Sequence, residues 1–512
     1  MNYADLFRVT LPETVLEMAA LLVLVVDLGL LRKAALKTHV ASVLGIVGCG
    51  ASVWAVYFAG AGGLSAGGDL LLAAGGSAGV AQVGILALTA VTLLLLIGAE
   101  FTRNPGEYVA VVLMAAAGGM IIAAAQDLLV IFIGLELLSL GLYVLTAFAK
   151  QSGKSAEAAI KYYLFGGMSA AFLLFGFSYL YGLSGSTSLA RVVYGTYVAN
   201  LHGGYPLLYV ALVMVAAGLG FKVAAVPFHL WAPDTYEGAP APAAAFIASV
   251  SKVASFALLI SISTAALHFL ESLHTTHIVT VIAGVAGTPL PPIVPGIRKV
   301  WPLTLVILSV ASMALGNLAA LAQSSVRRLL AYSAIAHAGY ILLGLAYFSQ
   351  TNMSAEAVLY YILTYGLTTV GAFGVIAVIE RATGSDRMDA FLGLQKRNPL
   401  LAAITLVLFL SLAGIPPLVG FWAKFNLFAA VLGVSHSGAA LGLVALAVAM
   451  SAVSLYYYLQ VLKRAYVMPG PDETPVHAHP VTMAVLLAIA AAVVVMGCFP
   501  ALLQNWIAGF YS

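Results

Sequence analysis

Residues 240–269, PAPAAAFIASVSKVASFALLISISTAALHF, are apolar enough to cross a lipid bilayer, yet they contain a lysine near their middle. No second charged residue lies between Pro240 and Leu270. Placing the Lys252 ammonium at this depth costs about 2.5–3.5 kcal/mol even on the lenient scale of membrane insertion. A chain that keeps such a residue indicates a use for the charge, and the simplest use is to carry a proton through the membrane.

The composition predicts that the whole chain is an all-α polytopic membrane protein. Of its 512 residues, 62% are hydrophobic and 8% are charged, and the mean hydropathy is +1.05. A soluble surface cannot be built from so few polar residues. The long apolar runs also exclude a β-barrel, whose strands would alternate between apolar and polar residues.

Apolar segments of about 20 residues, the length that spans a bilayer as a helix, predict fourteen transmembrane helices. They lie near residues 11–31, 39–59, 80–100, 106–125, 128–148, 156–182, 206–228, 240–268, 301–323, 328–348, 355–379, 399–432, 437–462 and 481–506. The segment 271–300 contains a short apolar run followed by TPLPPIVPG. We expect an interfacial loop there rather than a span.

The distribution of lysine and arginine predicts the orientation of these spans. Four of the 22 basic residues lie inside predicted spans. With the N-terminus outside, fourteen of the others fall on the cytoplasmic face and four on the outer face. This excess follows the rule that cytoplasmic loops are rich in positive charge. Both termini are therefore expected outside.

The chain also repeats itself at an interval of 199 residues. The sequence SAEA at 155–158 recurs at 354–357, and each copy opens a predicted span, the sixth and the eleventh. A unit of five spans is odd in number, so the second copy must be inverted in the membrane, as in many ion-coupled transporters. The predicted divisions are a three-helix segment at 1–105, a first repeat at 106–270, the loop at 271–300, a second repeat at 301–466, and a C-terminal loop and helix at 467–512.

Two predicted spans contain prolines that should break them. The seventh reads GLGFKVAAVPFHLW, and the twelfth reads SLAGIPPLVGFWAKF. A proline in a helix frees backbone carbonyl groups, which lipid cannot satisfy and which water or polar side chains must. Each break lies close to a lysine, Lys222 or Lys424, and so marks a place where a hydrated path could pass.

Five charged residues at membrane depth are candidates for carrying protons. Lys252 and Lys424 lie deep in their spans, and Glu136 and Lys222 lie at about mid-depth, where a change in their spacing could load and release a proton. A static buried ion pair is the alternative for each. Lys161 lies only about one turn into its span with Glu157 four residues before it, which fits an ordinary helix-end pair equally well.

Two histidines extend this set. His229 follows the proline of the seventh span, and His337 lies within LLAYSAIAHAGYILLGL, a span without other charge. A neutral, hydrogen-bonded core histidine is the alternative at both positions. The sequence contains no phosphate loop, dinucleotide fingerprint, nucleophile triad, metal site, or haem or flavin motif. We therefore expect no cofactor in this chain.

Several of these segments together resemble the antiporter-like membrane subunits of complex I, the proton-pumping NADH:quinone oxidoreductase. They are GFKVAAVPFHLWAPDTYEGAPAP, ASVSKVASFALL, RRLLAYSAIAHAGYILLG and SLAGIPPLVGFWAKF. The segment PDTYEGAPAP is similar to subunit N rather than to subunits L or M. The resemblance covers essentially the whole chain and implies one proton-translocation channel.

The resemblance implies roles for the candidate residues. Glu136 and Lys222 would form the coupled pair of the first half-channel, Lys252 the central relay, and Lys424 the residue of the second half-channel. The supporting polar axis would consist of Lys161, His229 and His337.

The resemblance also implies a setting for the chain. It would lie in a bacterial inner membrane beside other complex I membrane subunits, with flavin, iron–sulfur clusters and quinone on partner subunits. The alternative is a subunit of a multisubunit cation/proton antiporter, and the loop PDTYEGAPAP argues against it.

Overall fold

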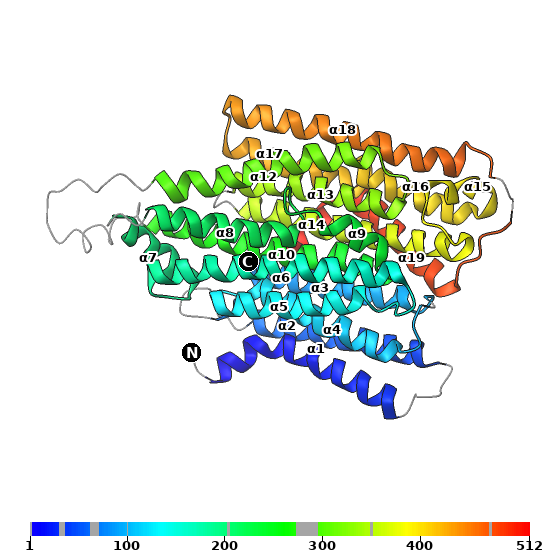
Figure 1. Ribbon diagram of the computed structural model, residues 1–512, viewed down its shortest axis with the longest axis horizontal. Coiled ribbons are helices and arrows are strands. Elements are labelled where there is room, and N and C mark those ends of the chain that lie inside the picture. The colour runs from blue at the N-terminus through cyan, green and yellow to red at the C-terminus, as the bar shows by residue number, and fades with distance from the viewer. Residues whose placement is uncertain are drawn as a thin grey trace.

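The computed structural model describes residues 3–29, 36–61, 71–99, 101–201, 205–272, 295–348, 352–470 and 474–511 as a bundle of long helices (Figure 1). The first half contains α1 (Tyr3–Gly29), α2 (Lys37–Gly60), α3 (Gly76–Leu96), α4 (Pro105–Ala124), α5 (Leu128–Thr146), α6 (Gly153–Ser184), α7 (Leu189–Leu201), α8 (Tyr205–Val223), α9 (Trp231–Gly238) and α10 (Ala241–Ser272). The second half contains α12 (Pro295–Leu321), α13 (Val326–Ala346), α14 (Asn352–Thr383), η1 (Met388–Phe391), α15 (Leu394–Arg397), α16 (Pro399–Ala413), α17 (Val419–Val434), α18 (Gly438–Tyr466), α19 (Pro480–Cys498) and α20 (Ala501–Ala508).

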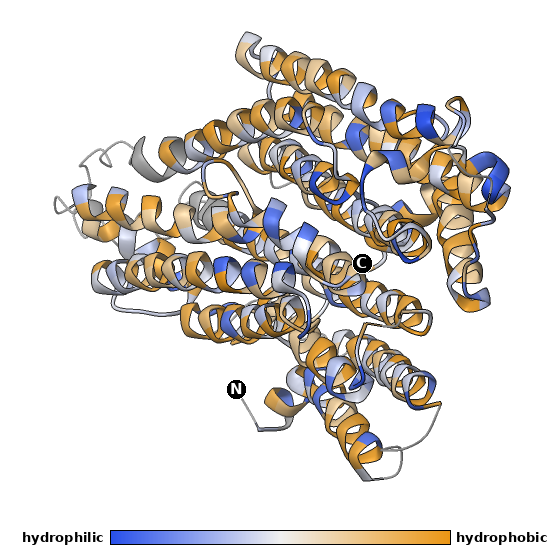
Figure 2. Ribbon diagram, turned by 45° about the vertical axis from the view of Figure 1, so that its right-hand side comes forward, coloured by the Kyte–Doolittle hydropathy of each residue, from blue (hydrophilic) through white to orange (hydrophobic). Residues whose placement is uncertain are grey.

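The predicted count of fourteen membrane passages is confirmed for this described part of the chain. Thirteen helices are long and apolar enough to cross a membrane alone. The fourteenth passage is divided between the shorter apolar helices α16 and α17, as the two prolines of the twelfth predicted span indicate. Figure 2 shows that most helices are hydrophobic along their length.

The 199-residue repeat is visible in the helices themselves. Helices α6 and α14 each have 32 residues, and their first and last residues are 199 positions apart. Each is followed by a glycine with positive φ, Gly185 at 69° and Gly384 at 70°. Glycine adopts this left-handed conformation without a steric penalty, and this conformation ends the helix. Local sequence therefore ends both helices in the same way.

The two repeats are inverted, as predicted. Helix α5 begins beside Ser188, just before α7, because Asp127 forms a bridge to Ser188. Helix α13 begins beside Arg387, just before η1 and α15, because Ser325 forms a bridge to Arg387. Helices α7 and α15 lie at opposite ends of the bundle (Figure 1). The corresponding helices α5 and α13 therefore start from opposite ends.

A hydrogen bond between a hydroxyl and a carboxylate holds the N-terminus of α5 and that of α13, but the capping residue is the carboxylate in one and the hydroxyl in the other. In the first repeat the Thr187 hydroxyl donates to the Asp127 carboxylate at 2.5 Å, and Asp127 caps α5. In the second repeat the Ser325 hydroxyl donates to the Asp386 carboxylate, and Ser325 caps α13. A hydroxyl and a carboxylate thus fasten each helix N-terminus to the segment that follows the next helix.

Both proline-containing passages are broken, as predicted. Residues 224–230 separate α8 from α9, and residues 414–418 separate α16 from α17. Serine side chains contact the freed backbone at each break. The Ser312 hydroxyl accepts a hydrogen bond from Val226 N at 2.9 Å, and the Ser411 hydroxyl accepts one from Gly420 N at 3.2 Å.

Three details differ from the prediction. Residues 233–238 of PDTYEGAPAP, expected as part of a loop, belong to helix α9, because Pro233 lies in the first turn, where a proline is tolerated. Helix α7, with 13 residues, was not expected; it is too short to span a bilayer, so a search for long apolar runs misses it. The prediction of a loop over 271–300 is wrong at its edges. Residues 271–272 belong to α10 and residues 295–300 to α12, while 273–294 lie outside the described residues.

Helix α10, which carries Lys252, forms the centre of the bundle. It packs against α3, α4 and α14, and nearly all of its 25-residue apolar span is buried. Helices α13 and α14 of the second repeat are almost as deeply buried. The candidate residues on α10 and α13 are therefore shielded from the bilayer by other helices.

Candidate functional site

Lys222 lies at the end of α8 and points toward α5. Its side chain is buried, and its ammonium donates a hydrogen bond to the Ser139 hydroxyl. Ser139 lies one turn after Glu136 on α5, and Glu136 is half-buried. The two charges are close enough to interact electrostatically, although among the described residues no direct ion pair joins them. Glu136 and Lys222 thus lie on neighbouring helices, and the hydrogen bond of the lysine goes to Ser139.

Lys252 reaches from α10 to the broken helix of its own repeat. Its buried ammonium donates to the Val223 carbonyl at 3.1 Å and to the Ala334 carbonyl at 3.0 Å. Val223 is the last residue of α8, so its carbonyl has no partner further along that helix. Lys252 therefore satisfies the severed end of α8 and contacts α13 of the other repeat.

Lys424 makes the corresponding contact in the second repeat. It lies on α17, and its buried ammonium donates to the carbonyls of Leu412 and Ala413 at 3.2 and 2.9 Å and to the Ser451 hydroxyl at 2.8 Å. Leu412 and Ala413 are the last residues of α16. Both lysines thus lie at the C-terminal end of a half-helix, where the helix dipole favours a positive charge.

The repeat relates these two sites in an unexpected way. Ser451 on α18 lies 199 residues after Lys252 on α10. Each of the two residues lies at the break of its own repeat, so α10 contributes an ammonium there and α18 a hydroxyl. In the second repeat the ammonium comes instead from the broken helix itself, and the hydroxyl binds it.

Helix α13 connects the two lysine sites. Ala334 accepts the hydrogen bond from Lys252, and the Tyr340 ring lies 5.5 Å from the Lys424 nitrogen. His337 lies between them at a spacing of three residues, which places all three on one helix face. His337 is close enough to both lysines to interact electrostatically with each. One helix face thus runs from the first lysine site to the second.

His337 is held by a tyrosine and lies beside a small cavity. Its Nδ1 shares a hydrogen bond of 2.8 Å with the Tyr361 hydroxyl. A cavity of about 10 Å³ lies against His337, lined also by Thr364, Thr368 and Ser411, and about this volume holds one water molecule. The Nε2 atom of His337 has no hydrogen-bond partner within the described part of the chain. The ring is therefore a neighbour of both lysines with one nitrogen available.

Two predicted residues lie apart from this axis. Lys161 is half-exposed and forms ion pairs of 2.7 Å with Glu157 and with Asp234, which is the helix-end pairing that the sequence left open. His229 is buried at the break after α8, and its Nδ1 has no hydrogen-bond partner among the described residues. We use "lysine axis" below for Lys222, Lys252, Lys424 and His337.

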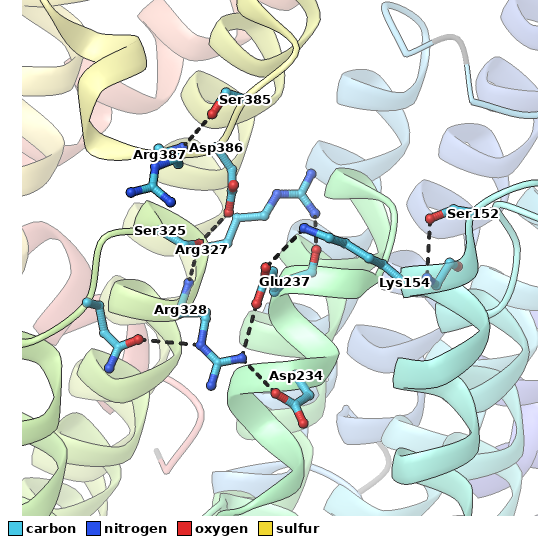
Figure 3. A network of polar contacts seen from close by, with 12 residues as sticks. Ser152, Lys154, Asp234, Glu237, Ser325, Arg327, Arg328, Ser385, Asp386 and Arg387 are labelled. Atoms are coloured by element: carbon cyan, nitrogen blue, oxygen red, sulfur yellow. Dashed lines mark hydrogen bonds and ion pairs between the residues drawn. The ribbon is translucent and has the colours of Figure 1, made fainter.

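A second group of charges lies around the start of α13, at the end of the bundle where α15 lies (Figure 1), and we name it the ion-pair cluster; Figure 3 shows its part around Arg327 and Arg328. It consists of Lys154, Lys161, Asp234, Glu237, Arg327, Arg328 and Glu380. Arg328 contacts Asp234 at 2.7 Å and Glu237 at 3.0 Å. Asp234 and Glu237 lie on α9, whereas Arg328 lies on α13, so the cluster ties the broken passage of the first repeat to the second repeat.

Arg327 is the most buried member of the ion-pair cluster. Its guanidinium pairs with Glu380 and donates to the carbonyls of Glu237 and Ala239, at 3.2 and 2.6 Å.

Two opposing effects act on the pKa of Asp234, another member of the cluster. Burial tends to raise the pKa of its carboxyl, but the Lys161 and Arg328 cations outweigh burial and hold that pKa below its usual value.

The sequence missed the hydroxyl and amide groups that line the axis. They are Ser139, Asn317, Tyr340, Tyr361, Ser451 and Tyr457. Serine and tyrosine are common in apolar helices, so their presence alone carries no signal. Within the described residues, no group of three or more His, Cys, Asp or Glu side chains could hold a metal ion.

Inverted repeats, broken helices and buried lysines at the broken ends together define an antiporter-like membrane subunit. The family described as NADH:quinone oxidoreductase/Mrp antiporter, transmembrane region, matches residues 125–290 and 276–451. The chain belongs to this family.

Curated relatives and solved structures agree. NADH-quinone oxidoreductase subunit N 2 of Acidobacterium capsulatum is 45% identical, covering 99% of both chains. Subunit N 1 of Roseiflexus castenholzii is 38% identical over 85% of this chain and 79% of its own. A chain of respiratory complex I from Thermus thermophilus has a TM-score of 0.75 at 31% identity, covering 96% of this chain and 98% of its own.

The Mrp complex of a Dietzia species contains a chain with the same fold. Its TM-score is 0.76, at 21% identity, covering 99% of this chain and 97% of that one. At this identity the likeness concerns the fold alone. The resemblance to subunit N is therefore confirmed, and it is favoured over the antiporter alternative.

Proposed function

We propose that this chain translocates protons as the subunit N of a bacterial NADH:quinone oxidoreductase. The observation that carries the proposal is the geometry of Lys252 and Lys424. Each lies buried at the severed C-terminal end of a half-helix, and the two are joined through one face of α13. The similarity to subunits N of NADH-quinone oxidoreductase supports the further proposal that a redox reaction on partner subunits drives the transfer.

The chemistry of these sites suits a group that gains and loses a proton. Burial disfavours the ammonium form of lysine, whereas the carbonyls at the end of a half-helix stabilise it. No carboxylate of the described residues pairs directly with Lys252 or Lys424, so deprotonation leaves no stranded negative charge beside them. In the proposed path, protons enter near Glu136 and Lys222, pass Lys252, and reach Lys424 with His337 between.

The setting follows from the same relationship. The proposed partners are the other membrane subunits of the complex, and the site is the plasma membrane of a bacterium with both chain termini outside. Flavin, iron–sulfur clusters and quinone belong to partner subunits, and this chain contributes no redox centre. A cation/proton antiporter subunit is the second candidate, because the fold is shared with an Mrp complex.

Substitutions of Lys252 test the proposal. Lys252→Ala removes a charge from the membrane, so the chain should still insert and assemble while proton pumping falls by about tenfold or more. Lys252→Arg should pump as poorly, because a guanidinium keeps its proton under almost all conditions. The measurement is proton pumping and assembled-complex yield in membrane vesicles. If Arg pumps like the native chain while Ala fails to assemble, Lys252 is structural and the proposal is wrong.

A further inference from the structure

Helix α1 carries a glutamate on its outer face at the middle of the membrane. The apolar span of this helix runs from Asp5 to Gly29, and Glu17 is its central residue. The Glu17 side chain is exposed. Neighbours that follow it on the same side are exposed and apolar: Met18 is 61% exposed, Leu21 55% and Val25 68%. Thr14, one turn before, is also exposed, and its hydroxyl donates to the Thr10 carbonyl. The Glu17 carboxyl thus lies at the edge of an apolar surface of α1.

The described part of the chain offers Glu17 neither a hydrogen bond nor an ion pair. Glu13, one turn earlier on the same helix, shows the contrast. Its carboxyl points inward, is buried, and accepts a hydrogen bond of 2.8 Å from the Gln82 amide on α3. Helix α1 therefore carries two carboxyls near mid-depth. The inner one has a donor from a packed neighbouring helix, and the outer one has no such neighbour.

Lipid tails cannot replace that neighbour. A carboxylate at the bilayer centre is costly because hydrocarbon offers no hydrogen-bond donor, and ionisable residues in membrane helices almost always face protein or water. A second copy of this chain would be a poor partner on this face, since two carboxylates would meet.

We propose that the α1 face formed by Glu17, Met18, Leu21 and Val25 is an interface with a transmembrane helix of another subunit. That helix presents a hydrogen-bond donor to the Glu17 carboxyl near the middle of the bilayer, and apolar side chains to the residues around it. The inference rests on the proposed membership of a multisubunit complex. It adds a contact surface on the N-terminal three helices, away from the lysine axis.

The first test identifies the occupant of this face. The photo-crosslinking residue p-benzoylphenylalanine replaces Met18, which leaves Glu17 intact, and the full complex is irradiated in native membranes. The expected product is an adduct with a transmembrane segment of a co-assembled subunit that contains a donor side chain within about one turn of the crosslink. An adduct with phospholipid alone, or with a second copy of this chain, would overturn the proposal.

The second test measures what the carboxyl contributes. Glu17→Leu should lower the yield of the crosslinked subunit in the detergent-purified complex by about tenfold, because its donor is left buried and unsatisfied. Glu17→Gln keeps an acceptor and should lose less, and Val47→Leu, at an exposed position on α2 outside this face, should behave as the native chain. A lipid-facing Glu17 predicts the reverse, with Leu equal to or better than native, and that result would refute the interface.

The two proposals fail in different ways. Variants of Glu17 should change assembly and leave pumping per assembled complex as in the native chain, whereas Lys252 variants should change pumping and leave assembly intact. Normal assembly of Glu17→Leu together with a pumping defect of Lys252→Ala would reject the interface alone.

Discussion

The basic residues of the lysine axis and those of the ion-pair cluster differ in what balances their charge. Lys252 and Lys424 donate to backbone carbonyls and a serine hydroxyl, which are neutral. Arg327, Arg328 and Lys161 instead lie against carboxylates. A base among neutral acceptors can release its proton without exposing a bare negative charge, whereas a base in an ion pair stays charged and fastens helices together.

This contrast separates moving charge from fixed charge within one bundle. The neutral acceptors of the axis are the severed ends of α8 and α16, so the breaks in the helices create the sites. The cluster lies at the end of the bundle and connects α6, α9, α13 and α14 through side chains. We therefore expect substitutions in the cluster to affect assembly, and substitutions in the axis to affect pumping per assembled complex.

The largest effect on stability is expected for Arg327→Ala. Arg327 is buried, pairs with the partly exposed Glu380 and donates to two backbone carbonyls, and removing these contacts costs about 2 kcal/mol or more. The yield of assembled complex should fall sharply, while complex that does assemble should pump normally. Thermal unfolding and pumping of the purified complex measure both. If the variant assembles fully but does not pump, Arg327 takes part in proton transfer, and the separation of the ion-pair cluster from the lysine axis is wrong.

The largest effect on pumping within the axis is expected for Lys424→Arg, compared with Lys161→Arg. A permanently charged guanidinium should stop transfer at position 424, lowering pumping by about tenfold or more. At position 161 the ammonium is paired with two carboxylates, so we expect arginine to be tolerated there. Both variants carry the same change, which makes Lys161→Arg the matched control. Equal pumping by the two variants would contradict the assignment of Lys424 to proton transfer.

A smaller effect is expected for Ser451→Ala. This substitution removes one of three hydrogen-bond partners of the Lys424 ammonium, and one hydrogen bond contributes about 0.5–1.5 kcal/mol, or about two- to tenfold in an equilibrium. Pumping should fall within that range and assembly should not change. Ser435→Ala, at a partly exposed position after α17, is the control. An unchanged pumping rate would remove Ser451 from the axis.

The smallest effect concerns pH and the cluster. The pKa of Asp234 is held below its usual value, so the charged carboxylate stabilises the fold at neutral pH. That stabilisation is complete above the unfolded-state pKa and is lost as the pH falls through the lower folded-state pKa. Thermal unfolding of the purified complex between pH 7 and pH 3 should therefore show a steeper acid loss for the native chain than for Asp234→Asn. Identical curves would show that Asp234 contributes nothing to this loss.

The passages and the repeat could be predicted from the sequence because both follow from local pattern. Many apolar runs of about 20 residues indicate helices that cross a membrane. Prolines at 227, 416 and 417 indicated where two of these helices are interrupted. Helix α7 escaped prediction because its 13 residues are short for a span and only partly apolar. Its existence depends on packing against α6 and α10, which no local pattern encodes.

The lysines of the axis were predicted, but their partners were not. Val223, Ala334, Leu412 and Ala413 contribute backbone carbonyls, which every residue has, so the sequence marks none of them. Glu136 and Lys222 were predicted as a coupled pair from charge and depth alone, and their coupling stays a prediction. The contact of the Lys222 ammonium with Ser139, one turn after Glu136, could not be predicted, because it depends on the relative rotation of α5 and α8.

The exchange of Lys252 for Ser451 across the repeat has a consequence for how such chains diverge after duplication. Two copies of one ancestral unit need not keep equivalent residues to keep an equivalent arrangement. Here a nitrogen occupies the same place at a severed helix end, supplied from α10 in one copy and from α17 in the other. Comparisons between duplicated halves should therefore align the positions of functional atoms in space, since an alignment of residues would score this pair as a loss.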